Sequence, residues 1–272
     1  ACDQAVIEAQ LGLADARRVW AMSLEALDLM RERCRRHAIA CDWRDGYLAV
    51  ATGERKAREL RAGVERMAEV YGYAQTWVER AELPRWVASP RYVAGAHDPR
   101  SGHLHPLKYC LGLRDAALAL GVRLHEHSAV TALDAEGSDA RLRTATGAQV
   151  RARQVLLAGN VYLHAFGPAL APRLAARIMP VGTYIVATEP LGPERAHALL
   201  PGGAAVSDTN FVLDYFRTSA DHRLLYGGRV SYSTTTPPNL AAAMRRRMRR
   251  TFPQLGEVAI EHAWGGFVDI SM

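Results

Sequence analysis

The chain has 272 residues, 49% of them hydrophobic, which is enough for one large domain or two ordinary domains with a buried core. No run approaches the roughly 18 uninterrupted apolar residues of a membrane helix, and the first residues lack the pattern of a signal peptide, so we expect a cytoplasmic protein without membrane contact. The net charge of +6 admits an anionic partner, but acidic and basic residues are mixed through most of the chain.

Three segments have the apolar spacing of amphipathic helices. Apolar residues recur at intervals of three and four from Leu13 to His37, and residues 54 to 72 repeat this spacing. A third helix is predicted to begin at Pro106, whose missing N–H is tolerated in a first turn, and to stop at Gly121.

The remaining segments favour strands and turns. Asp45-Gly46 predicts a turn between two short strands, and residues 122 to 130 alternate as a strand. A hairpin is expected to turn at Thr146-Gly147, and the apolar run from Val155 to Ala158 predicts a strand buried on both faces. A second β-rich block follows from Met179, so the chain alternates between two kinds of region, which favours two interleaved domains.

A dense arginine run, "MRRRMRR", lies within a further helical pattern. Leu240, Met244, Met248 and Phe252 recur every four residues and form an apolar stripe opposite five arginines. A solvated helix face is the simpler interpretation, and a phosphate-binding or nucleic-acid-binding face is the alternative. We expect no nucleic-acid binding.

The stretch "SGHLHPLKYC" admits a metal site, a catalytic pair or the start of a helix at His103 and His105. No Cys, Asp or Glu at metal-ligand spacing accompanies these histidines, so we expect no metal. The phosphate-binding loop Gly-x-x-x-x-Gly-Lys-Ser/Thr, the Gly-x-Ser-x-Gly elbow and Gly-x-Gly-x-x-Gly are all missing from the sequence. Residues 158 to 160 follow an apolar run and either let the backbone approach a ligand or form an ordinary strand-to-loop junction.

Several stretches, taken in order, resemble the FAD-dependent oxidoreductases of the D-amino-acid oxidase class, and within it the γ-glutamylputrescine oxidoreductase-like branch. They are "CDWRDGYLAVA", "SGHLHPLKYCLGLRDAALALGVRLHEHSAV", "QVLLAGNVYL", "IMPVGTYIVATEPLG", "DTNFVLDYFRTSADHRLLYGGRVSYS" and "AWGGFVDISM". The resemblance covers nearly the whole chain. It implies an α/β (α+β) fold with a discontinuous remnant of an FAD-binding domain and a substrate-binding domain built on a large mixed β-sheet.

The resemblance also implies a domain division and a central fragment. Enzymes of this class begin with a glycine fingerprint and end with a glycine-rich flavin segment, and neither is present in this sequence. We therefore expect the missing N- and C-terminal segments of the same enzyme as partners, and weak FAD binding by the chain alone. The expected parts are residues 1–37 and 99–175 in the FAD-binding domain, and residues 38–98 and 176–272 in the substrate-binding domain.

The resemblance places candidate site residues in two groups. For FAD, it implies that Val130 meets the adenine end and that the loop of Ala158, Gly159 and Asn160 passes the cofactor; for Val130 the alternative is ordinary strand core. For the substrate, the candidates are His103, His105, Tyr215, Arg217, Tyr232 and Trp264. Positioning and packing are the alternative for the two histidines, and no catalytic residue is identified.

A departure from the class points to the substrate. Amino-acid oxidases of this type tend to place an arginine shortly after a Trp-x-Gly turn, where it pairs with the substrate carboxylate, whereas here Phe267, Val268 and Asp269 follow. Asp269 attracts an ammonium group or caps a turn. The resemblance thus implies oxidation of a primary or secondary amine, γ-glutamylputrescine-like and derived from polyamine catabolism, by hydride transfer to FAD. The alternative is a non-catalytic amine-binding module without flavin.

Overall fold

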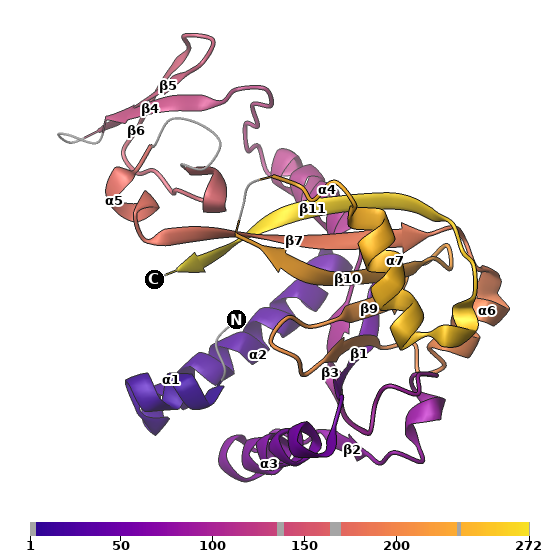
Figure 1. Cartoon of the computed structure of the whole chain (residues 1–272). Helices are drawn as coiled ribbons and strands as arrows, with labels where there is room; N and C mark the ends of the chain where they lie inside the picture. Colours follow the sequence, from indigo (N-terminus) through magenta and orange to yellow (C-terminus); the bar gives the residue numbers. More distant parts are fainter. Residues whose placement is uncertain (1–3, 135–138, 164–169, 233–234, 272) are drawn as a thin grey trace.

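A large mixed sheet forms the centre of the computed structural model, which describes residues 4–134, 139–163, 170–232 and 235–271 (Figure 1). Its eight strands lie in the order β11-β7-β10-β9-β8-β1-β3-β2. They are β1 (Arg44–Ala51), β2 (Thr76–Val78), β3 (Ala94–His103), β7 (Ile178–Thr188), β8 (Ala205–Asp208), β9 (Tyr215–Thr218), β10 (Leu224–Ser231) and β11 (Ile260–Ser271). Among the described strands of this sheet, β1 and β8 alone pair in parallel, and this pair joins two distant blocks of sequence into one sheet.

A smaller antiparallel sheet of β4 (Val130–Asp134), β5 (Ala140–Thr144) and β6 (Gln149–Ala152) stands apart from the large one, with α5 (Pro172–Ala175) near it (Figure 1). The short helix η2 (Asn160–Leu163) contacts β7 and β11 of the large sheet. The hairpin predicted at Thr146-Gly147 is confirmed between β5 and β6. Gly147 has a φ of 87°, in the left-handed region that a tight hairpin turn favours.

The predicted helices are confirmed, and their limits follow from local chemistry. The helical elements are α1 (Gln4–Leu11), α2 (Leu13–Arg36), α3 (Glu54–Tyr71), η1 (Leu83–Arg85), α4 (Pro106–Ala119), α6 (Gly192–Leu199), α7 (Leu240–Thr251) and η3 (Pro253–Leu255). Gly72 ends α3 with a left-handed φ of 62°, and Gly121 follows α4 with a φ of 82°. No helix among these described residues combines the length and apolar character that crossing a membrane requires.

The core lies between the large sheet and α7, which crosses one face of it (Figure 1). Leu240, Met244, Met248 and Phe252 are all buried, as their spacing predicts. The ring of Phe252 meets that of Phe216 on β9 edge-on, with 5.0 Å between centroids. The apolar stripe therefore fixes α7 on one side of the sheet.

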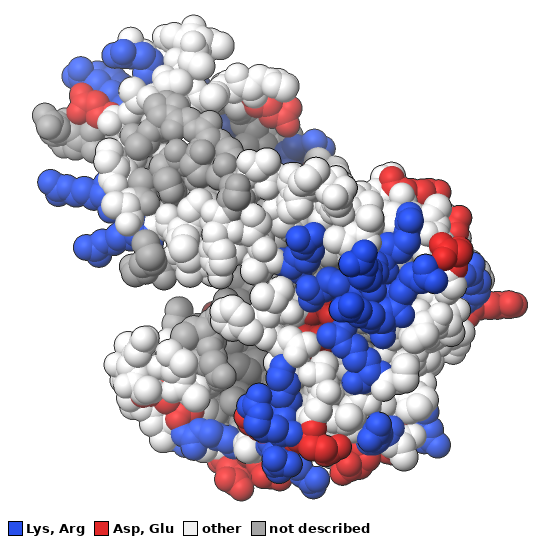
Figure 2. Space-filling view, viewed as in Figure 1, with Lys and Arg blue, Asp and Glu red and all other residues white. Residues whose placement is uncertain are grey.

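The arginines of α7 gather on the surface that Figure 2 shows. Arg245, Arg246, Arg249 and Arg250 line a shallow depression of about 420 Å³. Arg249 pairs with Glu257 at 2.8 Å, so part of this charge is compensated within the chain. The expectation that this face binds no nucleic acid stays a prediction.

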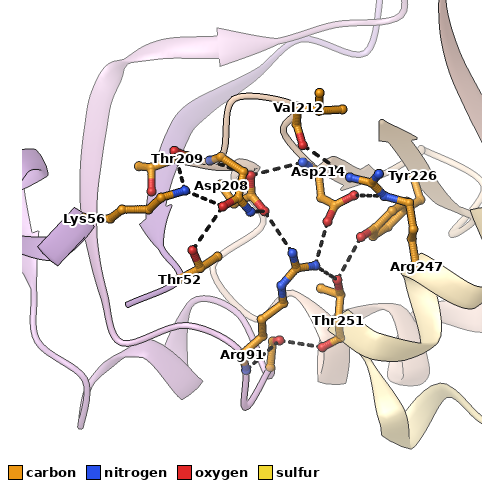
Figure 3. A network of polar contacts seen from close by, with 12 residues as sticks. Thr52, Lys56, Arg91, Asp208, Thr209, Val212, Asp214, Tyr226, Arg247 and Thr251 are labelled. Atoms are coloured by element: carbon orange, nitrogen blue, oxygen red, sulfur yellow. Dashed lines mark hydrogen bonds and ion pairs between the residues drawn. The ribbon is translucent and has the colours of Figure 1, made fainter. Parts of the chain in front are cut away.

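A buried polar network fastens the loop between β8 and β9 to α7 (Figure 3). The carboxylate of Asp214 accepts hydrogen bonds from Arg91 Nη1 at 2.6 Å and from Arg247 Nε at 2.7 Å. Asp208 Oδ1 accepts from the backbone N–H of Asp214 at 3.1 Å. Because this loop connects two strands of the sheet, the network also holds those strands in place.

Three sequence predictions are wrong. Asp45-Gly46 forms a β-bulge inside β1, where the register with β3 shifts and Gly46 has a φ of 102°. Of residues 122–130, only Val130 belongs to a strand, and His127 has a φ of 53° that interrupts the alternation. The run from Val155 to Ala158 is not a strand and pairs with no strand of the described residues, and Leu156 within it is 90% exposed.

These errors share one physical cause. A glycine with positive φ suits a bulge as well as a turn, and an apolar run becomes a strand only where a partner backbone takes up its hydrogen bonds. Asp269, for which a turn was one of two alternatives, lies within β11 opposite Pro180. The predicted domain limit between residues 98 and 99 falls inside β3. The four-part domain division stays a prediction.

Candidate functional site

A cavity of about 1060 Å³ opens on the face of the large sheet opposite α7. Tyr215, Phe216 and Arg217 of β9 all border the cavity. Because neighbouring side chains of a strand point to opposite faces, the Phe216 side chain is buried in the core while those of Tyr215 and Arg217 are on the cavity side. The volume slightly exceeds the range of about 300–1,000 Å³ that is usual for small-molecule sites. Its wall combines Tyr47, Ser207, Ile185, Leu225, His262 and Trp264 from the sheet with residues 104–108 at the start of α4.

Four of the six predicted substrate residues line this cavity: His105, Tyr215, Arg217 and Trp264. They come from α4's N-terminus and from β9 and β11, which are far apart in the sequence. His103 and Tyr232 do not line it; Tyr232 follows β10 and is 69% exposed. Their role in substrate binding stays a prediction.

Tyr215 is fixed by a contact that only glycine permits. A Cβ on Gly227 of β10 would stand 2.0 Å from the Tyr215 ring, so the ring lies directly over the backbone of the neighbouring strand. The Tyr215 hydroxyl and Thr183 Oγ1 are 2.9 Å apart, within hydrogen-bonding distance. Burial raises the pKa of Tyr215, so its hydroxyl stays protonated and available as a hydrogen-bond donor.

Tyr47 and Ser207 form a second hydroxyl pair on the cavity wall, from the parallel strands β1 and β8. Burial raises the pKa of Tyr47 as well. Sequence reasoning missed both residues. The alternation of β1 is the signal that would have found Tyr47, because its neighbours in the strand alternate between core and cavity.

His105 is the N-cap of α4, which agrees with interpreting "SGHLHP" as the start of a helix. The His105 Nδ1 accepts from the backbone N–H of Lys108 at 3.4 Å, and the backbone N–H of His105 donates to the carbonyl of Cys41 at 2.8 Å. Pro106 occupies the first turn. The cap holds the His105 side chain at the cavity edge.

His103 lies behind the wall, where its Nε2 is 3.2 Å from the carbonyl oxygen of Gly203. Burial lowers the pKa of this imidazole below the ordinary value of 6.5, with the positive charges of Arg217 and Arg44 adding to the effect. A neutral His103 is therefore the form that the fold accommodates.

This burial predicts a pH effect on stability. Above the unfolded-state pKa the imidazole is neutral in both states, whereas below it the unfolded chain binds a proton more readily than the folded chain does. Wild-type stability should thus fall, relative to His103→Gln, as the pH drops below 6.5 toward the lower folded pKa. Urea unfolding at about pH 7.5 and about pH 5.5 measures it. His125→Gln, at an exposed loop position, is the control. The same change in the free energy of unfolding between the two pH values for wild type and His103→Gln would contradict the prediction.

The charges around the cavity are mostly paired. Lys108 Nζ lies 2.7 Å from Asp42, and Arg223 Nε lies 2.7 Å from Asp221. Arg217 differs, because its Nη2 donates to the backbone carbonyl of Leu104 at 3.1 Å and it makes no ion pair with a carboxylate of the described residues. Burial acts to lower the pKa of Arg217, yet arginine stays charged throughout the usual pH range.

The predicted FAD-binding residues lie outside this cavity. Val130 begins β4 of the small sheet. Ala158 lies two residues before η2 and Asn160 is its first residue, and both are exposed. Asn160 has a φ of 51°, and its Oδ1 accepts from the N–H of Val161 at 2.7 Å. Gly159 lies against Leu163, where a Cβ would stand 2.8 Å from the side chain. Contact of these residues with FAD stays a proposal.

No group of three or more His, Cys, Asp or Glu within the described part of the chain is arranged to hold a metal ion. The wall combines hydroxyls, aromatic rings and apolar side chains with charged groups that include the pairs Lys108–Asp42 and Arg223–Asp221. Such a wall binds and orients a small organic ligand.

Comparison with known proteins places the chain in a family. Residues 3–272 match the family model described as FAD dependent oxidoreductase. The γ-glutamylputrescine oxidoreductase of Escherichia coli K12 is 40% identical over 262 residues, which cover 96% of this chain and 60% of that protein. The probable oxidoreductase OrdL of Haemophilus influenzae is 36% identical over 265 residues, with 97% and 60% covered.

Solved structures agree on the fold. Glycine oxidase from Geobacillus kaustophilus has a TM-score of 0.74 at 21% identity, covering 92% of this chain and 66% of that one. L-proline dehydrogenase from P. horikoshii has a TM-score of 0.75 at 16% identity, covering 89% and 65%. The chain spans about 60% of the length of the curated relatives it matches. It belongs to the family of FAD dependent oxidoreductases, and the cofactor of this family is FAD.

Proposed function

We propose that the protein is a flavin-dependent amine oxidoreductase that oxidises a primary or secondary amine of the polyamine-derived, γ-glutamylputrescine type. The observation that carries the proposal is the cavity of about 1060 Å³ on the face of the sheet opposite α7, in a chain of the FAD dependent oxidoreductase family. The name of the E. coli relative supports the substrate class.

The residues present fit an FAD ring together with a small substrate. The volume is at the upper limit of the usual range for small-molecule sites, and the wall offers apolar side chains beside the hydroxyls of Tyr47 and Tyr215. Val130 and residues 158–160 are the proposed contacts to the rest of the cofactor. When bound, FAD would accept the two electrons that leave the C–H bond next to the amine nitrogen.

The chain's own residues would bind and orient the amine. The apolar side chains of Ile185 and Leu225 exclude water from the floor, and the Trp264 ring offers an aromatic face to a cationic or neutral amine. Tyr215 is held rigidly and donates or accepts a single hydrogen bond at Thr183. No side chain of the wall is assigned as a general base.

Anaerobic flavin reduction tests the proposal. The protein at its natural length is loaded with FAD and desalted, and the visible flavin absorbance is followed while a polyamine-derived amine is added. We expect bleaching by the amine and none by the corresponding alcohol, because only the amine yields an imine. Arg245→Met, on the opposite face of the sheet, should behave as wild type. Amine binding without retained flavin would instead support the non-catalytic amine-binding module.

A further inference from the structure

The arginines on the surface of α7 take no part in the proposed oxidation. We infer that four of them bind a small anion that carries a chain of linked phosphate groups, such as a polyphosphate or the triphosphate of a nucleotide. They are Arg245, Arg246, Arg249 and Arg250, which line the depression of about 420 Å³ together with Ala242, here called the α7 site (Figure 2). The inference does not rest on the proposed oxidation, because α7 and the cavity lie on opposite faces of the sheet.

The helix spacing places the four guanidinium groups side by side. Residues four apart are neighbours on a helix surface, so Arg245 lies next to Arg249. Arg246 lies next to Arg250 in the adjoining row. Ala242 lies one turn earlier, and its small side chain leaves the space open. The volume falls within the range of about 300–1,000 Å³ that is usual for small-molecule sites.

The α7 helix lacks the acids that compensate arginines on another helix of this chain. In α2, Arg18 pairs with Asp15 at 2.9 Å and Arg36 pairs with Glu32 at 2.7 Å. The sequence of α7, LAAAMRRRMRRT, contains no Asp or Glu. Like charges four residues apart repel each other, so this arrangement is unfavourable until an anion compensates it.

One carboxylate from outside the helix reaches the α7 site. Glu257 pairs with Arg249 at 2.8 Å, and both side chains are more than half exposed. Arg246 and Arg250 make no hydrogen bond or ion pair with the described residues. Within the same described part of the chain, the buried Nε of Arg245 has no acceptor. A buried N–H without an acceptor is unfavourable, and an anion toward which this guanidinium turns would supply one.

The helix dipole explains only part of this cluster. A positive charge is favourable within the last turn of a helix, which accounts for Arg249 and Arg250. Arg245 and Arg246 are the sixth and seventh of the twelve residues of α7 and lie outside that turn. Their place in the cluster therefore calls for a negatively charged ligand.

The chemistry of the α7 site favours phosphate. The planar fork of a guanidinium matches phosphate oxygens, and neighbouring guanidinium groups can each contact a different phosphate of a chain. Burial of Met244 and Met248, and the hydrogen bond from Arg247 to Asp214 at 2.7 Å, fix the helix before a ligand binds. The described lining includes no aromatic ring, so it offers no stacking surface to the base of a nucleotide.

Isothermal titration calorimetry with inorganic tripolyphosphate tests the α7 site, on the FAD-loaded protein at its natural length. We expect tripolyphosphate to bind about tenfold or more tightly than inorganic phosphate, because its linked groups contact several guanidinium groups at once. Salt at about 0.5 M should weaken this binding relative to about 0.05 M, because exposed charges are screened. ATP compares the two sources of a phosphate chain, and we expect it to bind no more tightly than tripolyphosphate.

Arg246→Gln/Arg250→Gln should weaken tripolyphosphate binding about tenfold or more, because it removes two unpaired guanidinium groups at exposed positions. Arg18→Gln/Arg36→Gln is the matched control. It also removes two exposed positive charges from one helix, and it should bind tripolyphosphate as wild type does.

Three results would overturn the α7 site. The first is an equal loss of tripolyphosphate binding in both double variants, which would be a response to net charge alone. The second is binding of tripolyphosphate no tighter than that of inorganic phosphate. The third is tighter binding of a short single-stranded DNA oligonucleotide than of tripolyphosphate, which would make this face a nucleic-acid surface. Tighter binding of ATP, lost in Arg246→Gln/Arg250→Gln, would support the site with a nucleotide as its ligand.

Discussion

Replacing Asp214 by alanine is expected to lower the free energy of unfolding by about 3–5 kcal/mol, because it removes the acceptor from a buried ion network. The Asp214 side chain is 1% exposed and faces both Arg91 and Arg247. Without the Asp214 carboxylate, the positive charges of the two guanidinium groups repel each other. Asp208, 3.5 Å from Arg91, would still pair with one of them. Urea unfolding followed by circular dichroism measures the loss.

Glu257→Ala is the matched control for this prediction. Glu257 also pairs with an arginine of α7, but its side chain is 78% exposed, so we expect a change within about 1 kcal/mol. Asp214→Asn should lie between the two, because it keeps the shape and loses the charge. A change of less than about 1 kcal/mol for Asp214→Ala would show that the network is not needed for stability.

Gly227→Ala should both destabilise the protein and damage the cavity. The new methyl group would stand 2.0–2.7 Å from three carbons of the Tyr215 ring, so the ring or the β10 backbone must move. Overpacking of this kind costs about 1–3 kcal/mol. Because Tyr215 is part of the cavity wall, we also expect the polyamine-derived amine to bind at least tenfold more weakly in isothermal titration calorimetry, which is about 1.4 kcal/mol.

Gly63→Ala separates this effect from a general response to an added methyl group. Gly63 lies inside α3, and a Cβ there would meet nothing within 4 Å. Alanine is a better helix former, so this variant should gain about 0.5–1 kcal/mol and leave ligand binding unchanged. If calorimetry and urea unfolding gave the two variants the same result, the close approach of Tyr215 to Gly227 would be refuted.

Much of the fold follows from local pattern. The stripe on α7, the glycine after α4 and the hairpin at Gly147 lie where their spacing and turn chemistry predict, since each depends on residues close in the sequence. The family membership also follows from ordered stretches along the chain, and the comparisons bear it out. The bulge at Gly46 and the exposed run at Leu156 were not predictable in this way, because both depend on whether a distant strand pairs there.

The candidate site also combines features that follow from the sequence with features that only the structure reveals. The sequence by itself indicated, through its resemblance, the family of FAD dependent oxidoreductases, and it singled out His105, Tyr215, Arg217 and Trp264. Only the tertiary structure decided that these four share one cavity, that Tyr47 and Ser207 join them, and that His103 and Tyr232 stand outside the lining. The physical reason is that cavity shape, burial and charge pairing arise between strands that the chain brings together from opposite halves, such as β1 and β8.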